Sequence, residues 1–227
     1  DLAGLLSLLD NIDGLKRIRF TSPHPRHVTG RLISALRDLP KVCKHLHLPI
    51  QSGSTRILSL MRRRHTREHY LSLITRIKNQ IPDIALSTDI IVGFPGETEQ
   101  DFQETLDLIK QVQYNNIFSF KYSERPNTLA AQRIPDTTPE TVKSDRLTKL
   151  QKLQKSIQLK LNNAMIGQTH EVLLEGRSRR RSYEQTGRTQ GNTIVNFSGP
   201  ILTPGQLVTV AIRKATANSI WGQTVTQ

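Results

Sequence analysis

The stretch ALSTDIIVGFPGET, residues 85–98, predicts a buried strand that ends in a tight turn before a helix. A nearly continuous apolar run stops at Gly93, and a proline and Gly96 follow at once. Glycines permit unusual dihedrals and close backbone approach, and proline stiffens the turn between them. Thr98 and Asp101 have the spacing of a capping box, which explains both of them. Capping does not explain the paired glycines, which indicate a small molecule bound against the strand end.

Strand candidates and amphipathic helices alternate through the first 125 residues. Strands are expected at 15–20, 45–50, 85–94 and 117–122, and helices at the N-terminus and within 28–39, 55–79 and 102–112. Such alternation implies parallel βαβ units with right-handed crossovers. Four units are too few to close an eight-stranded barrel. We therefore expect an α/β fold with an open, partial β/α barrel of four parallel strands.

The rhythm of the sequence changes after this region. A long helix is expected from near Pro139 to near Gly167, with an apolar stripe and with Lys143 and Arg146 elsewhere on the cylinder. Short strand candidates then alternate with glycine and proline turns, which favours a small antiparallel barrel. The stripe comprises Val142, Leu147, Leu150, Leu153, Ile157 and Leu161, and the short strands are expected at 170–176, 193–197, 207–212 and 219–225. The expected parts are residues 1–140, a connecting helix at 141–162, and a second domain at 163–227.

The composition indicates a globular protein with a polyanionic partner. The formal net charge is +13, and 36% of the residues are hydrophobic. Residues 141–162 carry 6 Lys or Arg against 1 acid, and residues 163–227 carry 7 against 3. A concentrated basic excess favours nucleic acid, because each phosphate neutralised releases counterions. No window approaches eighteen uninterrupted apolar residues, so we expect neither a membrane span nor a membrane partner.

Cysteine use points to a reducing compartment. Cys43 is the one cysteine, so an intrachain disulfide is impossible and a cytoplasmic location is expected. The N-terminal apolar residues follow helical spacing with no basic region before them, which is unlike a signal peptide. A helix already under way, with no initiator Met, suggests a chain that lacks its own beginning.

Polar residues follow each expected strand, where ligands of parallel β/α barrels collect. Thr21 to Pro25 follow the first strand, Gln51 to Ser54 the second, and Tyr122 to Pro126 the fourth. With the Gly93 turn, four polar clusters should therefore meet on one rim of the sheet.

The histidines do not predict a metal site. His45 and His47 share a strand face but lack a third ligand, and His65 and His69 lack the glutamate of an HExxH motif. His24, on the expected rim, is the better functional candidate. No catalytic residue is assigned.

A basic loop of the second domain is the candidate RNA-binding surface. A run of arginines between the first strands of a small barrel is suited to gripping phosphates. Tyr183 and Trp221 could stack a base, whereas Phe197 is expected in the core. The candidate RNA-binding residues are Arg177, Arg179, Arg180, Arg181, Arg188 and Lys214.

Several motifs, in order along the whole chain, resemble one enzyme family. RIRFTSPHP, LPIQSGS, MRRRHTREHY, LSTDIIVGFPGET and FKYSERPNTLAA look like the methylthiotransferases of the radical S-adenosylmethionine superfamily, and the last 60-odd residues resemble their RNA-binding TRAM domain. TSPHP and FKYSERP look most like the tRNA branch. That branch adds a methylthio group to carbon 2 of an isopentenylated adenosine next to the anticodon.

The resemblance implies cofactors, site residues and a partner. One 4Fe-4S cluster cleaves S-adenosylmethionine to an adenosyl radical, and a second cluster supplies sulfur; the sulfur donor remains unassigned. The partner implied is a tRNA anticodon stem-loop. The residues that the resemblance places at the cofactor face are Ser22, His24, Gln51, Ser52, Gly93 and Arg125.

The cysteines depart from the family pattern. The family holds one cluster on a CxxxCxxC loop and the other on three cysteines of an N-terminal domain, and this sequence has neither. Cys43 matches no ligand position, so no cluster is expected on this chain alone. The expectation is the C-terminal half of the enzyme, with the N-terminal half of the same enzyme as its missing partner. The alternatives are a methylthiotransferase acting on threonylcarbamoyladenosine or on a ribosomal protein, and a stand-alone RNA-binding protein with a decayed half-barrel.

Overall fold

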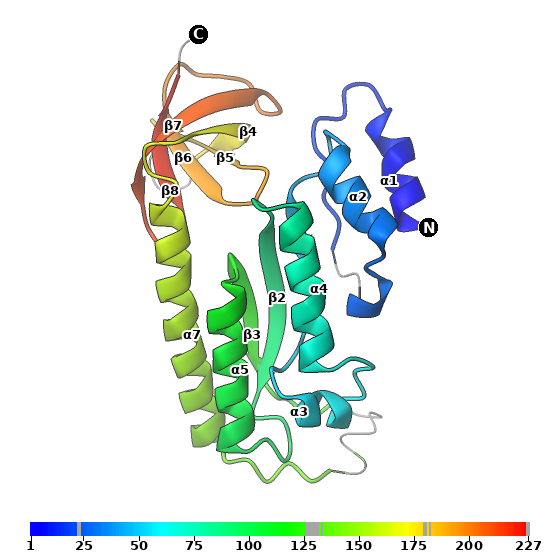
Figure 1. The fold of residues 1–227 in the computed structure, drawn as a ribbon. Coiled ribbons are helices and arrows are strands. Elements are labelled where there is room, and N and C mark those ends of the chain that lie inside the picture. The colour runs from blue at the N-terminus through cyan, green and yellow to red at the C-terminus, as the bar shows by residue number, and fades with distance from the viewer. Residues whose placement is uncertain (22–23, 126–131, 133, 179–180, 182, 226–227) are drawn as a thin grey trace.

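A parallel sheet covered by helices on one side is joined through one long helix to a small closed barrel (Figure 1). The structure is a computed structural model, which describes all residues except 22–23, 126–131, 133, 179–180, 182 and 226–227. The sheet has three strands in the order β1-β2-β3, namely β1 (His45–His47), β2 (Ala85–Val92) and β3 (Asn116–Lys121). Both strand pairs are parallel. The expected partial β/α barrel is therefore present.

The strand expected at 15–20 is reduced to a single bridging residue. Within 15–20, only Ile18 pairs, through an isolated parallel bridge to Val42. The expectation of a full strand there was wrong, because backbone groups of the facing segment bond elsewhere: Lys41 N–H donates to Asp10, and the Cys43 carbonyl accepts from His45 N–H. Strand β1 is also shorter than expected. Pro49 offers no N–H for the ladder, and pairing resumes at the Gln51–Ile90 bridge.

The helices begin where the sequence places hydrogen-bonding caps. Thr98 and Asp101 form a complete capping box at α5, as predicted. The side chains of Asp1, Thr29, Ser54 and Thr66 likewise accept from first-turn amides of their helices. The helices before the long one are α1 (Leu2–Asp10), the 3₁₀ turn η1 (Pro25–His27), α2 (Gly30–Asp38), α3 (Thr55–Leu60), α4 (Arg67–Gln80) and α5 (Glu99–Val112).

Side chains alternate along β2 between a buried apolar face and a polar face. Leu86, Ile90 and Val92 are buried in the core between the sheet and its helices. Tyr70 ties this core together, because its hydroxyl donates to the Leu48 carbonyl at 2.9 Å and accepts from the hydroxyl of Tyr114. The alternate residues of β2 point to the opposite, open face of the sheet.

The long helix α7 (Glu140–Asn163) packs against the core by the expected apolar stripe, but its buried face is wider than that stripe. Leu150 and Ile157 are buried, and Leu147, Leu153 and Leu161 pack against the core. Lys143 and Arg146 are only 6% and 5% exposed, although both were expected on the outer side. Gln154 is also buried, and its amide donates to the Tyr114 carbonyl at 2.9 Å. Polar partners on the body of the fold, rather than an apolar stripe alone, therefore determine how α7 is rotated.

A buried ion pair holds α7 against the turn after β2. Arg146 Nη1 donates to Glu97 Oε2 at 2.8 Å, and the Gly93 N–H donates to the same oxygen at 2.6 Å. Gly93 has φ +69°, and a Cβ built there would lie 2.5 Å from Lys143 Cγ. The glycine and the acid in VGFPGET thus let the turn and α7 approach each other closely.

The small barrel closes with five strands rather than the four expected. They are β4 (Thr169–Arg177), β5 (Gln185–Arg188), β6 (Ile194–Ser198), β7 (Leu207–Ala215) and β8 (Ile220–Thr224), in the closed order β4-β5-β6-β8-β7. Sequence analysis did not predict β5, because its sequence QTGR contains no apolar run. The expectation of a wholly antiparallel barrel was also wrong, since β6 and β8 pair in parallel. Phe197 is fully buried in the barrel core, as expected.

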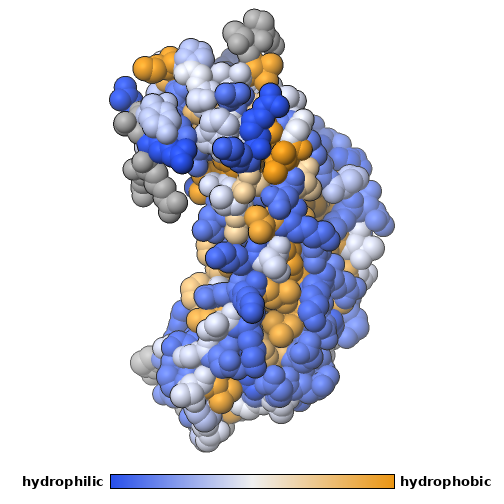
Figure 2. Space-filling model, turned by 90° about the vertical axis from the view of Figure 1, so that its left-hand side faces the viewer, coloured by the Kyte–Doolittle hydropathy of each residue, from blue (hydrophilic) through white to orange (hydrophobic). Residues whose placement is uncertain are grey.

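The barrel is docked at the end of the sheet where β2 and β3 begin (Figure 1). Arg17 donates to the Glu171 carbonyl at 2.9 Å, and Arg19 donates to the Thr189 and Gln190 carbonyls at 2.6 and 2.9 Å. A profile view shows the barrel standing out over a hollow in the body of the molecule (Figure 2).

Gly93→Ala should destabilise the protein more than Gly14→Ala does. Both glycines have positive φ, but a Cβ at Gly14 meets nothing within 4 Å. Gly14→Ala should cost about 1 kcal/mol for the left-handed backbone, whereas Gly93→Ala adds a clash with Lys143 of roughly 1–3 kcal/mol. Urea denaturation measures both variants. Equal losses would contradict the close approach of α7.

Arg146→Met should lower the free energy of unfolding by about 3–5 kcal/mol at neutral pH, because it leaves the Glu97 carboxylate buried and unpaired. Glu97→Gln/Arg146→Met should recover most of that loss. Burial already raises the pKa of Glu97, and the Arg146 charge opposes the rise. Without Arg146, the folded-state pKa rises further above the unfolded value, so the folded state binds the proton more tightly. The penalty should therefore shrink as pH falls from 7 towards 5; a pH-independent penalty would argue against a charged Glu97.

Candidate functional site

A cavity of about 840 Å³ opens at the ends of β2 and β3, on the side away from the small barrel, and we call it the rim cavity. Gln51 and Arg125 both line it, so two of the predicted rim residues meet there. Arg62 and Arg63 line it from the segment after α3. The other lining residues are Leu60, Met61, Asp89, Ile91, Phe94, Phe120, Lys121, Tyr122 and Ser123.

Gln51 is held in an unusual backbone conformation at this cavity. Its φ is +79°, a left-handed value that costs a non-glycine residue about 1–2 kcal/mol. Two hydrogen bonds to β2 maintain it: Gln51 N–H donates to the Asp89 carbonyl, and Ile91 N–H donates to the Gln51 carbonyl, both at 2.9 Å. Strained residues that are held in this way cluster at ligand sites.

Tyr122 presents an unsatisfied hydroxyl in the same cavity. Its Oη is buried and has no hydrogen-bond partner among the described residues. The ring packs edge-on against Phe94 at 5.1 Å, and Lys143 Nζ lies 5.6 Å from its centroid. Burial raises the pKa of the hydroxyl, which therefore stays protonated. A buried hydroxyl without a partner has hydrogen-bonding capacity left for a ligand.

The other predicted cofactor residues lie elsewhere. Ser52 is fully buried, and its hydroxyl accepts from Ser54 N–H at 3.2 Å and lies 3.4 Å from Thr105 Oγ1, so it stabilises the loop and is absent from the cavity wall. The N–H of Gly93 is taken by Glu97, and Gly93 is likewise absent from the wall. His24 lines a separate cavity of about 410 Å³. Ser22 lies outside the described residues.

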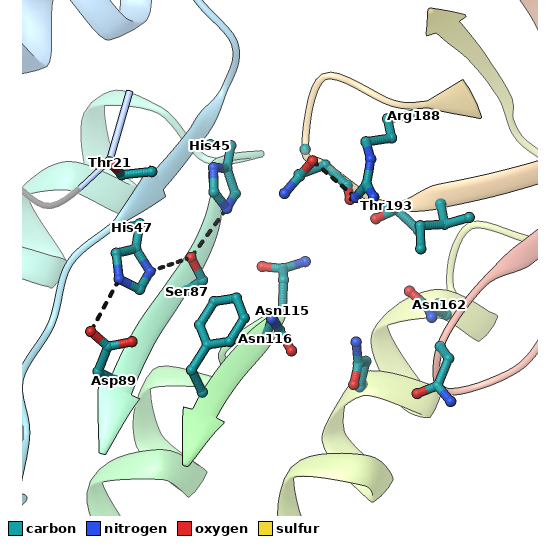
Figure 3. A pocket seen from close by; sticks show the side chains of 16 residues that line it. Thr21, His45, His47, Ser87, Asp89, Asn115, Asn116, Asn162, Arg188 and Thr193 are labelled. Carbon is teal, nitrogen blue, oxygen red and sulfur yellow. Dashed lines mark hydrogen bonds and ion pairs between the residues drawn. The ribbon is translucent and has the colours of Figure 1, made fainter. Parts of the chain in front are cut away.

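A second cavity, of about 650 Å³, lies between the open face of the sheet and the small barrel (Figure 3). Three side chains of the sheet are joined by hydrogen bonds along its floor, and Asp89 lies next to them at ion-pair distance. Ser87 Oγ lies 3.2 Å from His45 Nε2 and 3.0 Å from His47 Nδ1, and His47 Nε2 lies 3.4 Å from Asp89 Oδ2. The opposite wall, from the barrel, carries Arg188 and Thr193 (Figure 3).

This polar chain can exchange protons and hydrogen bonds with a ligand. Burial lowers the pKa of His45 to about 4, so its imidazole is neutral at physiological pH and has one donor and one acceptor nitrogen. Phe118 stands beside His47 with ring centroids 5.7 Å apart and is 49% exposed, which leaves a face free for stacking. Asp89 lines both cavities. Sequence analysis missed Ser87 and Asp89. Two polar residues at alternate positions within ALSTDIIV indicate that one face of this strand is polar.

Metal or cluster binding has no support among the described residues. No group of three or more His, Cys, Asp and Glu side chains there is arranged to hold a metal ion. Cys43 is 2% exposed, and burial raises the pKa of its thiol. An iron–sulfur cluster needs several thiolates, so this chain's residues do not fit one.

The basic surface of the small barrel is partly neutralised. Arg181 pairs with Glu184 at 3.0 Å, and Arg188 pairs with Glu175 at 3.0 Å. Lys214 lies over the Trp221 ring at 5.8 Å. Arg177 is exposed at the end of β4 and Tyr183 is 73% exposed, so phosphate and base contacts are both available there. Arg179 and Arg180 lie outside the described residues.

Two family models match the chain. The radical SAM superfamily model covers residues 1–109, and the TRAM domain model covers residues 163–225. The chain is 48% identical to the tRNA-2-methylthio-N(6)-dimethylallyladenosine synthase of Acetivibrio thermocellus over 98% of its length, and 47% identical to that of Moorella thermoacetica over 99%. The chain thus contains a radical SAM superfamily region and a TRAM domain, and over nearly its whole length it is similar to these methylthiotransferases.

The chain spans about half the length of these curated relatives, 46% and 50% respectively. Among solved structures, coproporphyrinogen III oxidase from Escherichia coli, a radical SAM enzyme, is similar with a TM-score of 0.56 and 14% identity. The alignment covers 99% of this chain and 56% of that one, and it supports the fold alone. No helix in the described part of the chain is long and apolar enough to cross a membrane.

Tyr122→Phe should leave the free energy of unfolding unchanged or raise it slightly, because it removes a buried hydroxyl that has no partner. Tyr70→Phe is the matched control. It removes a hydroxyl with two partners and leaves the buried Tyr114 hydroxyl without its acceptor, although the Leu48 carbonyl keeps its bond from Thr88. The loss should cost about 1–3 kcal/mol. Urea denaturation of both variants measures the difference. A comparable loss in Tyr122→Phe would show that its hydroxyl already has a partner.

Proposed function

We propose that this chain acts in tRNA modification, the methylthiolation of carbon 2 of an N6-isopentenyladenosine next to the anticodon. The observation that carries the proposal is the placement of two cavities along one open face, between a basic barrel and the strand ends. Asp89 lines both cavities, so a nucleotide held near the barrel has a continuous polar path to the rim. We assign the reaction to the cytoplasm, as a single buried cysteine favours.

S-adenosylmethionine fits the rim cavity. Its polar groups can meet the strained Gln51, the unsatisfied Tyr122 hydroxyl and the Arg125 guanidinium, while Phe94 and Ile91 supply apolar wall. When it is bound and reduced in enzymes of this superfamily, S-adenosylmethionine supplies an adenosyl radical. The residues of this chain bind and orient it and exclude water. The family's 4Fe-4S clusters have no ligand set in this chain, and no step is assigned through them.

The proposed substrate contacts divide between the two lobes. The barrel, residues 163–227, binds the RNA backbone. The helix at 141–162 connects the barrel to the sheet. Residues 1–140 receive the nucleotide to be modified. The open sheet face offers Phe118 for stacking, and His47 and Asp89 for hydrogen bonds to a base edge. Unstacked bases are recognised by this combination of aromatic faces and polar groups.

The test is binding of the whole chain to an anticodon stem-loop RNA, followed by fluorescence anisotropy over a range of salt concentrations. Affinity should fall steeply with salt, and Arg179→Ala/Arg180→Ala/Arg181→Ala should weaken binding to all RNA sequences alike and make the salt dependence shallower. Tyr122→Phe is the control and should leave RNA affinity unchanged, while it weakens S-adenosylmethionine binding measured by calorimetry.

Two outcomes would reject the proposal or redirect it. Binding that ignores both salt and the three arginines would reject the RNA assignment. Stem-loops with and without the N6-isopentenyl group compare the proposed substrate with other adenosines. Tighter binding of a threonylcarbamoyladenosine stem-loop, or of a ribosomal protein, would assign the chain to another branch of the family.

A further inference from the structure

The segment after α3 gathers arginines that form no ion pair with the residues that the structure describes. Arg62, Arg63 and Arg64 line a cavity of about 760 Å³, together with His65, Thr66 and other residues of the α3–α4 region. The same three arginines also line the adjoining cavity of about 410 Å³, with Arg26 and His24. None of the four arginines makes an ion pair with another described residue, whereas Arg56, Arg146, Arg181 and Arg188 all do.

A buried imidazole with no partner lies at the back of this cluster. His65 is 6% exposed, and neither ring nitrogen has a hydrogen-bond partner among the described residues. Burial, with smaller contributions from His24 and Arg63, lowers its pKa to about 4, so the ring is neutral and retains one N–H donor. His24 stacks edge-on against it at 5.4 Å. A buried polar ring without a partner indicates that a ligand completes its hydrogen bonds.

No described acidic residue lines either of these two cavities. Asp89 interacts electrostatically with Arg63 from the neighbouring cavity at the strand ends, whose wall it shares with Arg62 and Arg63. Glu68, in the first turn of α4, lies 3.3 Å from the Thr55 hydroxyl and is absent from both cavity walls. Arg62 is exposed with φ +55°, and Arg64 is also exposed, so both guanidinium groups are accessible. Planar guanidinium groups bind phosphate oxygens in pairs.

We propose that Arg26, Arg62, Arg63 and Arg64, backed by His65, form a phosphate-binding site for the backbone of the RNA substrate. We call these five residues the rim arginine site. Arg62 and Arg63 also line the rim cavity, so a phosphate held there lies beside the proposed cofactor. The inference rests on the proposed RNA substrate and adds a second anchor at the end of the sheet opposite the basic barrel. RNA would thus be gripped at both ends of the open face.

The test compares two double variants with the same net charge. Arg62→Gln/Arg64→Gln removes two charges from the rim arginine site, and Lys152→Gln/Lys155→Gln removes two from exposed positions of α7 that form no hydrogen bond or ion pair with a described residue. Stem-loop RNA affinity is measured by anisotropy over a range of salt concentrations. The rim variant should lower the slope of log affinity against log salt by about 1 per arginine, and the α7 variant should leave it unchanged.

Two further variants separate charge from folding. Arg62→Lys/Arg64→Lys keeps both charges and should retain most of the slope. His65→Phe removes only neutral hydrogen-bonding atoms, so it should lower affinity without changing the slope, and it should not reduce thermal stability.

The outcomes are distinguishable. If the rim variant matches the α7 variant while Arg179→Ala/Arg180→Ala/Arg181→Ala still lowers the slope, the rim arginine site is rejected and the proposed function stands. If the unaltered chain shows no salt-dependent RNA binding, both are rejected. Loss of slope in the glutamine variant, with retention in the lysine variant, supports the site.

Discussion

The buried pair of Glu97 and Arg146 fixes the helix on which the rest of the structure depends. Both side chains are almost fully enclosed, and a lone buried charge is far costlier than a paired one. The pair requires α7 to lie against the turn after β2, and the absence of a side chain at Gly93 allows it to come that near. From there α7 runs along the sheet to the small barrel, where Asn162 donates to the Thr216 and Ala217 carbonyls.

The far end of α7 and the two arginines before the sheet together orient the barrel. The guanidinium groups of Arg17 and Arg19 donate hydrogen bonds to backbone carbonyls of the barrel, and these bonds hold the barrel at the beginning of β2. The barrel and the rim cavity consequently lie at opposite ends of the sheet, with the open polar face between them. A polymer substrate suits this layout better than a small molecule does, because it can contact the barrel and still reach the rim.

Two buried polar groups at cavity walls differ from the paired arginines of the barrel. Arg181 and Arg188 of the barrel pair with Glu184 and Glu175, so the capacity of these two arginines for phosphate is shared with internal pairing. The hydroxyl of Tyr122 and the ring of His65 are buried and have no hydrogen-bond partner in the described part of the chain. Since a buried polar group without a hydrogen bond costs free energy, both are destabilising in the free protein and are stabilised when a ligand supplies the missing bond.

The sequence by itself determined what depends on neighbours along the chain. Helix caps such as Thr98, the parallel alternation of strands and helices, and the buried Phe197 follow from local hydrogen bonding and from the period of apolar residues. Only the tertiary structure decided what depends on distant partners. In the folded chain Ile18 forms only a single bridge, and Lys143 and Arg146 are buried. Gly93 lies against α7 and does not line the rim cavity. A charged side chain is buried only where its counterion lies, and Glu97 and Arg146, 49 residues apart, carry no local signal that the two will meet.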